Sequence, residues 1–163
     1  MVSPEIKQMY QEIILDLANE NNARYNLDQF NKKIIQNSFL ITEQFNPNCG
    51  DKIKVAGSFT KNKLDNYFWT GLGCNISMAS ANYLGEWIIG KTTDEVLEVY
   101  KLFLELMNSR GQELTSEKMD KLDDLSAFIG VAKFPARIKC ALLAWEAIHN
   151  IIVQNQNKAK AAK

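Results

Sequence analysis

Residues 38–70 read SFLITEQFNPNCGDKIKVAGSFTKNKLDNYFWT, and they contain three short segments of strand-forming residues. Ser38–Thr42 is rich in residues that favour extended backbone. In Lys52–Gly57 the two lysines alternate with isoleucine and valine, as in a strand with one buried face. The third segment is Leu64–Thr70. The sequence therefore predicts three β-strands within 33 residues of chain.

Turn-forming residues separate the three predicted strands. Asn46–Asp51 combines Asn, Pro, Gly and Asp, and Thr60–Lys63 is typical of a hairpin. Because each short turn reverses the direction of the chain, the three strands are expected to form an antiparallel meander.

An amphipathic helix is predicted before the strands. Ser3 is a suitable N-cap, and Pro4 fits the first helical position. Apolar side chains then recur at helical spacing: Ile6, Met9, Tyr10, Ile13, Ile14 and Leu17. The polar run Asn19–Asn22 ends this helix, and a connector leads from it to the first strand.

The second half of the chain is predicted to be helical. Gly90 ends one helix, a capping box of Thr92 and Glu95 starts the next, and Gly111 ends that one. Met119, Leu122 and Leu125 indicate a weaker helix. A final helix follows Phe134 and carries the apolar residues Ile138, Ala141, Leu142, Trp145, Ile148 and Ile152.

These elements predict an α+β fold with an N-terminal helix, a three-stranded antiparallel meander and a helical layer that covers one face of the sheet. A chain of 163 residues has the usual size of one domain, which we expect to span residues 1–153. Residues 154–163 lack an apolar face and are expected to form a frayed polar tail.

The amino-acid composition excludes some classes of function and of partner. The chain is 46% hydrophobic and 23% charged, and its 19 basic residues balance 19 acidic ones. Such a balance favours neither nucleic acid nor an anionic membrane as a partner. A membrane-spanning helix requires about 18 consecutive apolar residues, and no apolar stretch approaches this length. The first residues also lack the apolar core of a signal peptide. We therefore expect a cytoplasmic protein with no membrane or nucleic-acid partner.

The three cysteines offer the clearest candidate site. Cys49 lies in the first turn, and Cys74 lies in the glycine-containing segment that follows the third strand. In a meander, the turn between the first two strands and the end of the third strand lie at the same edge of the sheet. Cys49, Asp51 and Cys74 are therefore expected to share that edge.

Cys140 lies near the start of the last predicted helix, and it joins the other cysteines if that helix begins at the same edge. Three sulfurs and the Asp51 carboxylate would make four ligands. Such a set suits tetrahedral zinc, and it also suits an iron-sulfur cluster. The intervals between the cysteines are much longer than in a CxxC motif, so separately buried or incidental cysteines are the alternative.

Neighbouring charges favour a metal at this place. Lys133, Arg137 and Lys139 flank Cys140, and cations there would stabilise the negative charge of three thiolates and a carboxylate on a divalent ion. His149 falls on the opposite helix face, at about 100° per residue. It is therefore not expected to be a ligand, and the same separation excludes a hydrolase that pairs Cys140 with a histidine base.

Three segments of the chain resemble a known family: Asn46–Asp51, Gly73–Ala81 and Lys133–Trp145. They resemble the SufU-type iron-sulfur cluster assembly proteins, which are relatives of the IscU and NifU scaffolds. The resemblance covers about residues 9–152, in the same order and with matching secondary structure.

The resemblance implies a zinc site and a role in iron-sulfur cluster biogenesis. The implied zinc ligands are Cys49, Asp51, Cys74 and Cys140, and Cys49 would accept persulfide sulfur from a SufS-like, pyridoxal-phosphate cysteine desulfurase. Arg137 matches a family arginine beside the site, where it could hold Asp51 or the freed thiolate. A zinc-dependent sulfurtransferase of this kind would also meet a downstream acceptor of sulfur or of a cluster.

The alternative implied by the wider family is a scaffold that assembles an iron-sulfur cluster on the same cysteine and aspartate ligands. Two features separate the chain from the IscU scaffolds: the long segment between Lys91 and Lys133, and the absence of a histidine directly before Cys140. The segment Leu17–Arg24 departs from the SufU pattern as well. This departure concerns contacts of the N-terminal region with a desulfurase and leaves the implied ligands unchanged.

Overall fold

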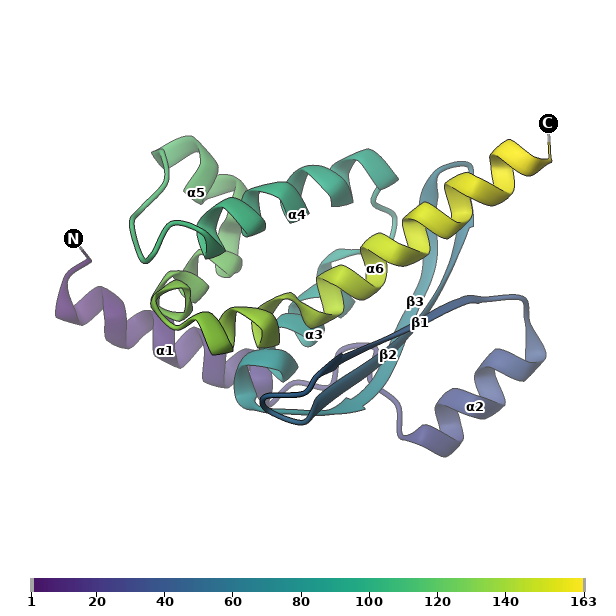
Figure 1. Cartoon of the computed structure of the whole chain (residues 1–163), viewed down its shortest axis with the longest axis horizontal. Coiled ribbons are helices and arrows are strands. Elements are labelled where there is room, and N and C mark those ends of the chain that lie inside the picture. The colour runs from purple at the N-terminus through teal and green to yellow at the C-terminus, as the bar shows by residue number, and fades with distance from the viewer. Residues whose placement is uncertain (1, 163) are drawn as a thin grey trace.

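The computed structural model describes residues 2–162 and places six α-helices, one 3-10 helix (η1) and three strands in them (Figure 1). Their bounds are α1 Pro4–Ala18, α2 Leu27–Gln36, β1 Leu40–Asn46, β2 Asp51–Thr60, β3 Lys63–Leu72, α3 Asn75–Trp87, α4 Thr93–Met107, α5 Ser116–Leu122, η1 Asp123–Lys133 and α6 Pro135–Ala161.

The predicted meander is confirmed. The strand order is β1-β2-β3, and both neighbouring pairs are antiparallel. The hairpin between β2 and β3 turns at Lys61 and Asn62, which both have positive φ angles, as in a tight turn that matches the twist of the strands. The first strand is displaced from the prediction: it begins at Leu40 and continues to Asn46, where it pairs with Asp51.

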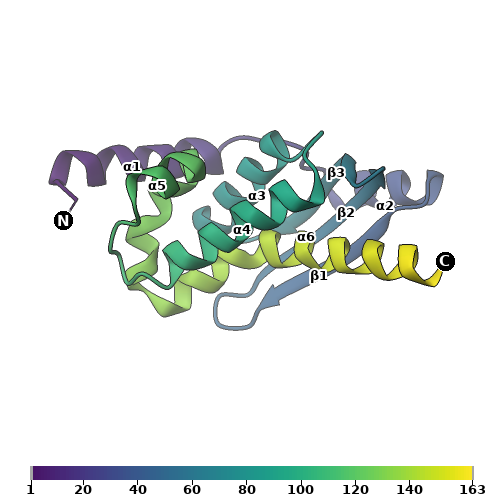
Figure 2. The ribbon, with the colours of Figure 1, turned by 90° about the horizontal axis from the view of Figure 1, so that it is seen from above.

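The predicted helical layer is also confirmed. Figure 2 shows α6 lying along β1 and β2, with α3 and α4 beside it. Ile53 and Val55 point from β2 into the same core as Trp145 and Ile148 of α6, and all four side chains are fully buried. Burial of each such side chain stabilises the fold by roughly 1.5–3 kcal/mol before conformational entropy is counted.

The chain between α1 and β1 contains a helix that the sequence reasoning missed. Asn26 caps α2, and its side chain and that of Gln29 form a capping box. Phe30 packs with Ala56 and Phe68 on the sheet face opposite α6. The predicted connector is therefore wrong over Leu27–Gln36. Phe30 and Ile34 lie one turn apart on an apolar helix face that packs against the sheet, and the capping box starts the helix.

The helices of the second half follow their predicted start signals more closely than their predicted ends. Thr92 and Glu95 form the expected capping box of α4. The helix ends at Met107, before Gly111, whose φ of 86° belongs to the turn that follows. The predicted weak helix divides at Asp123 into α5 and η1, because the φ of Asp123 is 50° and interrupts the α-helical backbone.

The last helix is long. It continues to Ala161, and residues 154–161 project beyond the sheet with mostly exposed side chains (Figure 1). Fraying of this segment stays a prediction, as does the domain boundary at residue 153. Within residues 2–162, none of the helices combines the length and apolar character needed to cross a membrane.

Candidate metal centre

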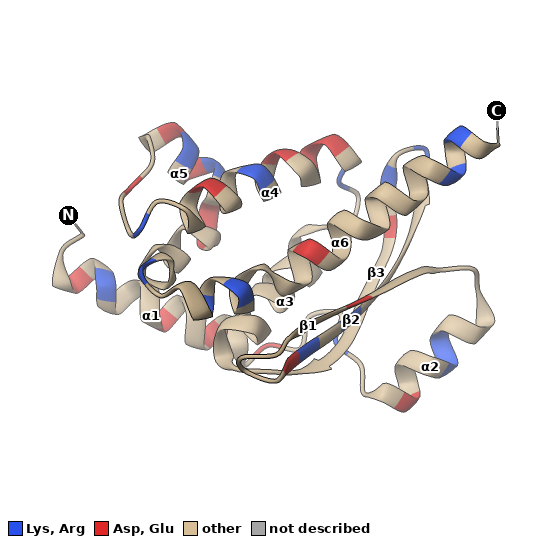
Figure 3. Ribbon diagram, viewed as in Figure 1, with Lys and Arg blue, Asp and Glu red and all other residues tan. Residues whose placement is uncertain are grey.

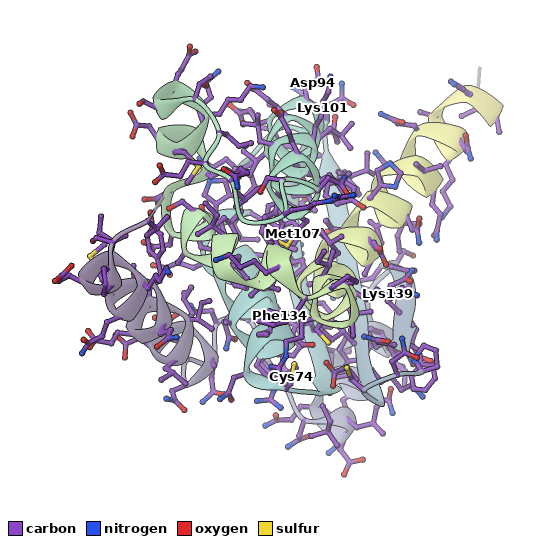
Figure 4. The ribbon with its side chains drawn as sticks, turned by 60° about the vertical axis from the view of Figure 1, so that its left-hand side comes forward. Cys74, Asp94, Lys101, Met107, Phe134 and Lys139 are labelled. Carbon is purple, nitrogen blue, oxygen red and sulfur yellow. The ribbon has the colours of Figure 1, made fainter. Side chains whose placement is uncertain are left out.

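Four segments that are distant in the sequence meet at one end of the sheet. They are the turn after β1, the start of β2, the segment that joins β3 to α3, and the first turns of α6. Figure 4 shows Cys74 at the start of α3 and Phe134 at the start of α6 on the same side of the molecule. Each segment brings one of the predicted ligands. The antiparallel topology places Cys49, Asp51 and Cys74 at this end, and the packing of α6 adds Cys140.

Three of the four predicted ligands form a close cluster. The Sγ atoms of Cys49 and Cys140 are 3.3 Å apart. One ligand atom each from Cys49, Asp51 and Cys140 lies within 4.8 Å of the other two. Cys49 is exposed, whereas Cys140 is 1% exposed and Asp51 3%. The cluster therefore has a buried floor and one accessible thiol.

Cys74 contacts the cluster through Asp51 and lies outside the group of three. Its thiol donates to Asp51 Oδ2 at 3.3 Å, and its backbone N–H donates to Asp51 Oδ1 at 3.2 Å. Cys74 is also the N-cap residue of α3. Its sulfur therefore lies at the N-terminal, positive end of that helix.

Asp51 is a buried carboxylate that hydrogen bonds keep charged. Burial raises its pKa, but hydrogen bonds from Ser77, Cys140 and Cys74 outweigh burial and hold the pKa below its ordinary value. None of the salt bridges within residues 2–162 involves Asp51. A buried anion with adjacent thiols and no cationic side chain bonded to it fits a bound metal cation.

The environment of Cys140, in contrast to that of Asp51, favours the protonated side chain. Burial raises the pKa of its thiol above the ordinary value, and contacts with Cys49 and Asp51 raise it further. The thiol is therefore protonated in the metal-free protein near neutral pH. A metal ion that binds the cluster must displace this proton, as is general for thiol ligands.

Two supporting residues of the site were missed at the sequence level. Asn46 is 1% exposed, and its amide nitrogen lies 3.3 Å from Cys140 Sγ and 3.6 Å from Cys49 Sγ. Ser77 is fully buried and donates a short hydrogen bond to Asp51 Oδ2. Asn46 is the last residue of β1, and Ser77 lies one helical turn after Cys74. Both residues are close to the ligands in the sequence, but only the tertiary packing directs their side chains toward the ligand atoms.

Two glycines allow the backbone to assemble this centre. Gly50 follows Cys49 with a φ of 73°, a conformation that favours glycine. Gly73 lies so close to the site that an added Cβ would stand 3.0 Å from Asp51 Cγ. A side chain at position 73 would press against the ligand carboxylate.

The basic residues around Cys140 are solvent-exposed. Lys133, Arg137 and Lys139 lie at and before the start of α6, where Figure 3 shows a group of basic positions. In the described part of the chain, Arg137 makes no side-chain hydrogen bond or salt bridge. Its role beside Asp51 therefore stays a prediction. His149 packs 5.4 Å from the Tyr100 ring, so its expected exclusion from the ligand set is consistent with its position.

Three large apolar side chains are exposed near this end of the sheet. Phe45 is 57% exposed, Leu72 77% and Phe134 56%. Phe45 and Leu72 both pair with Lys52 across the sheet, one position from Asp51, and Phe134 directly precedes α6. We call these three residues the apolar rim. Exposed apolar groups of this size are typical of a surface that another protein covers.

The chain belongs to the family of NifU-like N-terminal domains, whose model matches residues 9–141. This family membership agrees with the resemblance inferred from the three sequence segments.

Individual relatives carry two different descriptions. The chain is 32% identical over 148 residues to the zinc-dependent sulfurtransferase SufU of Bacillus subtilis, covering 91% of this chain and 92% of that protein. It is 38% identical over 112 residues to the iron-sulfur cluster assembly scaffold protein IscU of Streptococcus pyogenes, covering 69% and 68%. The crystal structure of a Fervidobacterium islandicum protein described as an iron-sulfur cluster assembly scaffold for the SUF system (SufU) superposes with a TM-score of 0.73 at 30% identity, covering 89% of this chain and 97% of that one.

Proposed function

We propose that this protein is a zinc-dependent sulfurtransferase that accepts persulfide sulfur from a cysteine desulfurase for iron-sulfur cluster biogenesis. The observation that carries the proposal is the exposed Cys49 thiol, 3.3 Å from the buried Cys140 thiol and clustered with the Asp51 carboxylate. The similarity to SufU of Bacillus subtilis over nine tenths of both chains supports it.

The proposed ligands are Cys49, Asp51, Cys74 and Cys140. The first, second and fourth already lie within 4.8 Å of one another, and Cys74 is one contact away from Asp51. When bound, zinc would keep the cysteine sulfurs deprotonated at neutral pH. The charged, cation-free Asp51 carboxylate gives the site the negative charge that such an ion requires.

Cys49 is the proposed sulfur acceptor because it is the one exposed thiol of the cluster. Its thiolate would attack the outer sulfur of the desulfurase persulfide. A new S–S bond then forms on Cys49, the S–S bond of the donor breaks, and the desulfurase cysteine leaves as a thiolate. No external oxidant or reductant is needed, because the sulfur moves between two thiols.

The proposed partners are a SufS-like, pyridoxal-phosphate cysteine desulfurase and a downstream acceptor of sulfur or of a cluster, in the cytoplasm. The apolar rim supports a protein partner, since its exposed side chains lie at the end of the sheet that carries Cys49 and Asp51. Docking on the rim would cover Cys49 and exclude water from the exchange. Arg137 is proposed to assist by holding Asp51 or the freed Cys49 thiolate once the partner closes over the site.

A second candidate function is an iron-sulfur cluster assembly scaffold. It is favoured by the 38% identity to the Streptococcus pyogenes protein of that description, and the same four ligands would hold the cluster. Metal analysis separates the two functions. Protein purified without added iron contains about one zinc per chain in the first case, whereas a scaffold binds a coloured cluster on anaerobic reconstitution with iron and sulfide.

The sulfur-transfer proposal is tested by mass spectrometry. The wild type and Cys49→Ala are incubated with a cysteine desulfurase and cysteine, and the extra sulfur is mapped to a residue. We expect one added sulfur on Cys49 of the wild type and none on the folded Cys49→Ala, which keeps Asp51, Cys74 and Cys140 for zinc. Sulfur found only on Cys74 or Cys140 would show that the acceptor is assigned to the wrong residue.

A further inference from the structure

Asn46 bridges the two thiols of the centre. Its Nδ2 lies 3.3 Å from Cys140 Sγ and 3.6 Å from Cys49 Sγ, and its side chain is buried. An amide nitrogen carries two hydrogens, so it can donate one to each sulfur. A neutral thiol is a weak hydrogen-bond acceptor, whereas a thiolate is a strong one. The Asn46 amide therefore forms its strongest hydrogen bonds when both sulfurs are thiolates.

The orientation of this amide is fixed by its other end. Asn46 Oδ1 accepts the backbone N–H of Asn48 at 3.2 Å. The backbone carbonyl of Asn46 accepts the N–H groups of Cys49 and Gly50, at 3.3 and 2.8 Å. Flipping the amide would lose the bond to Asn48 and turn an oxygen toward two sulfurs. Asn46 therefore shapes the turn that carries Cys49 and simultaneously aims its nitrogen at the ligands.

From these contacts we infer that Asn46 is a positioning residue that sets the metal affinity of the centre and stabilises Cys49 when its thiolate leaves the metal. The inference rests on the metal site of the proposed function. An N–H donor withdraws electron density from a thiolate, and partners of this kind tune both the affinity and the electronic properties of metal-sulfur sites. When Cys49 leaves the metal, the second amide hydrogen still compensates part of its charge.

Two substitutions of Asn46 and one control variant separate its role in shaping the turn from its role as a hydrogen-bond donor to the sulfurs. Asn46→Asp keeps the shape and the acceptor for Asn48 but replaces the donor with a charged acceptor. Asn46→Ser keeps an oxygen near the turn and removes the amide. Asn48→Asp is the matched control, because it adds the same charge two residues away, at an exposed side chain that contacts neither sulfur in the described part of the chain.

The probe is cobalt(II), whose thiolate charge-transfer bands report directly on the sulfur ligands. Affinity is measured by competition with a chelator, and folding of each metal-free variant by thermal unfolding. We expect Asn46→Ser to bind cobalt roughly 10- to 100-fold more weakly, as for other residues that support metal ligands. Asn46→Asp loses the donor as well, but its carboxylate can itself attract the cation, so the charge-transfer bands are the readout for both variants. Their charge-transfer bands should move to lower energy, because the thiolates lose a stabilising donor. Asn48→Asp should keep the wild-type affinity and bands.

The outcomes distinguish this inference from the proposed function. A wild type that binds neither cobalt nor zinc overturns the metal site and the inference with it. A wild type that binds cobalt through thiolates, together with Asn46→Ser of unchanged affinity and unchanged band energy, overturns the role of Asn46 and leaves the metal site standing. If Asn46→Asp does not fold, the comparison of Asn46→Ser with the wild type decides.

Discussion

Cys140 and Cys49 show how position in the fold gives the same residue type two different tasks. Cys140 is buried in the second turn of α6, and its environment raises its pKa. Cys49 lies 3.3 Å away on an exposed turn. The buried thiol suits a permanent ligand, because its release would leave an unpaired group in the core. The exposed thiol can leave the metal and meet a partner.

Replacing Cys140 by serine is expected to abolish zinc binding and to lower the melting temperature. A ligand present at about 1,000 times its Kd stabilises the native state by about 4.1 kcal/mol. For a chain of this size, 1 kcal/mol corresponds to roughly 2–4 °C, so the melting temperature should fall by about 10 °C. The measurements are zinc content and differential scanning calorimetry.

Wild type treated with a chelator is the control, because it should melt close to Cys140→Ser. Cys74→Ser should lose zinc as well if Cys74 completes the ligand set. Full zinc occupancy in Cys140→Ser would contradict the site, whereas full occupancy in Cys74→Ser alone would reduce the protein ligands to three.

Replacing Arg137 by alanine is expected to slow sulfur acceptance without loss of stability. Arg137 is exposed, and exposed charge interactions contribute about 0–1 kcal/mol. A contribution of about 1 kcal/mol to the transfer step corresponds to a roughly fivefold lower rate. The rate is measured at a saturating concentration of desulfurase, and Lys139→Ala on the same helix turn is the control. Equal rates for Arg137→Ala and the wild type would return Arg137 to a solvated surface role.

At the scale of elements, the helices are defined better by their starts than by their ends. The capping boxes of α2 and α4 both form in the structure. The capping box at Asn26 and Gln29 and the helical spacing of Phe30 and Ile34 are both local signals for α2, and the predicted connector took account of neither. Helix ends depend in addition on the packing available to the next turn, which a stop signal such as Gly111 does not record.

The C-terminal part of α6 is expected to fray in solution. Its side chains from Gln154 onward are mostly exposed, and a helical segment of this length is marginal in water without tertiary packing. Hydrogen exchange should show fast amides in residues 155–161 and slow amides in residues 141–152, which are the internal control. Removing residues 154–163 should leave the melting temperature almost unchanged. Strong amide protection up to Ala161 would contradict the predicted tail.

At the scale of the whole molecule, one core joins the helices of both ends of the chain to the sheet. The same cluster contains Leu17 of α1, Ile53 of β2, Phe103 of α4 and Ile148 of α6. Because these elements share their buried surface, we expect metal-free protein to unfold in a single cooperative transition. A single unfolding transition is the measurable consequence of the predicted single domain.

The stability of the metal-free protein is expected to depend on Asp51 at acid pH. The native state holds the pKa of Asp51 below its ordinary value of 3.8. The native state therefore binds this proton less readily than the unfolded chain, and Asp51 stabilises the fold above the ordinary pKa. That stabilisation is lost as the pH falls through the lowered pKa.

Urea unfolding of metal-free protein between pH 2.5 and pH 7 tests this linkage. Asp51→Asn should be less stable near neutral pH and should lose less stability on acidification than the wild type. Asp16→Asn, at an exposed position, is the control and should follow the wild type. Parallel pH profiles for the wild type and Asp51→Asn would contradict the assigned ionisation of Asp51.

The sequence by itself determined the meander, most helices and the edge at which the cysteines meet. Strand segments, turns and caps are local features, and the alternation of strand direction then requires Cys49, Asp51 and Cys74 to lie at one end of the sheet. The contacts of Cys74 with Asp51 agree with that reasoning, whereas Cys140 comes within 4.8 Å of Cys49 and Asp51 because α6 begins at the same edge.

Only the tertiary structure decided which side chains complete the centre. Asn46 and Ser77 aim at the sulfurs and at Asp51 because β1, α3 and α6 are packed together there, and Arg137 stays in solvent for the same reason. Phe30 likewise places α2 on the second face of the sheet. Local sequence encodes backbone preference and periodicity, whereas the direction of a buried polar side chain depends on partners distant in the chain.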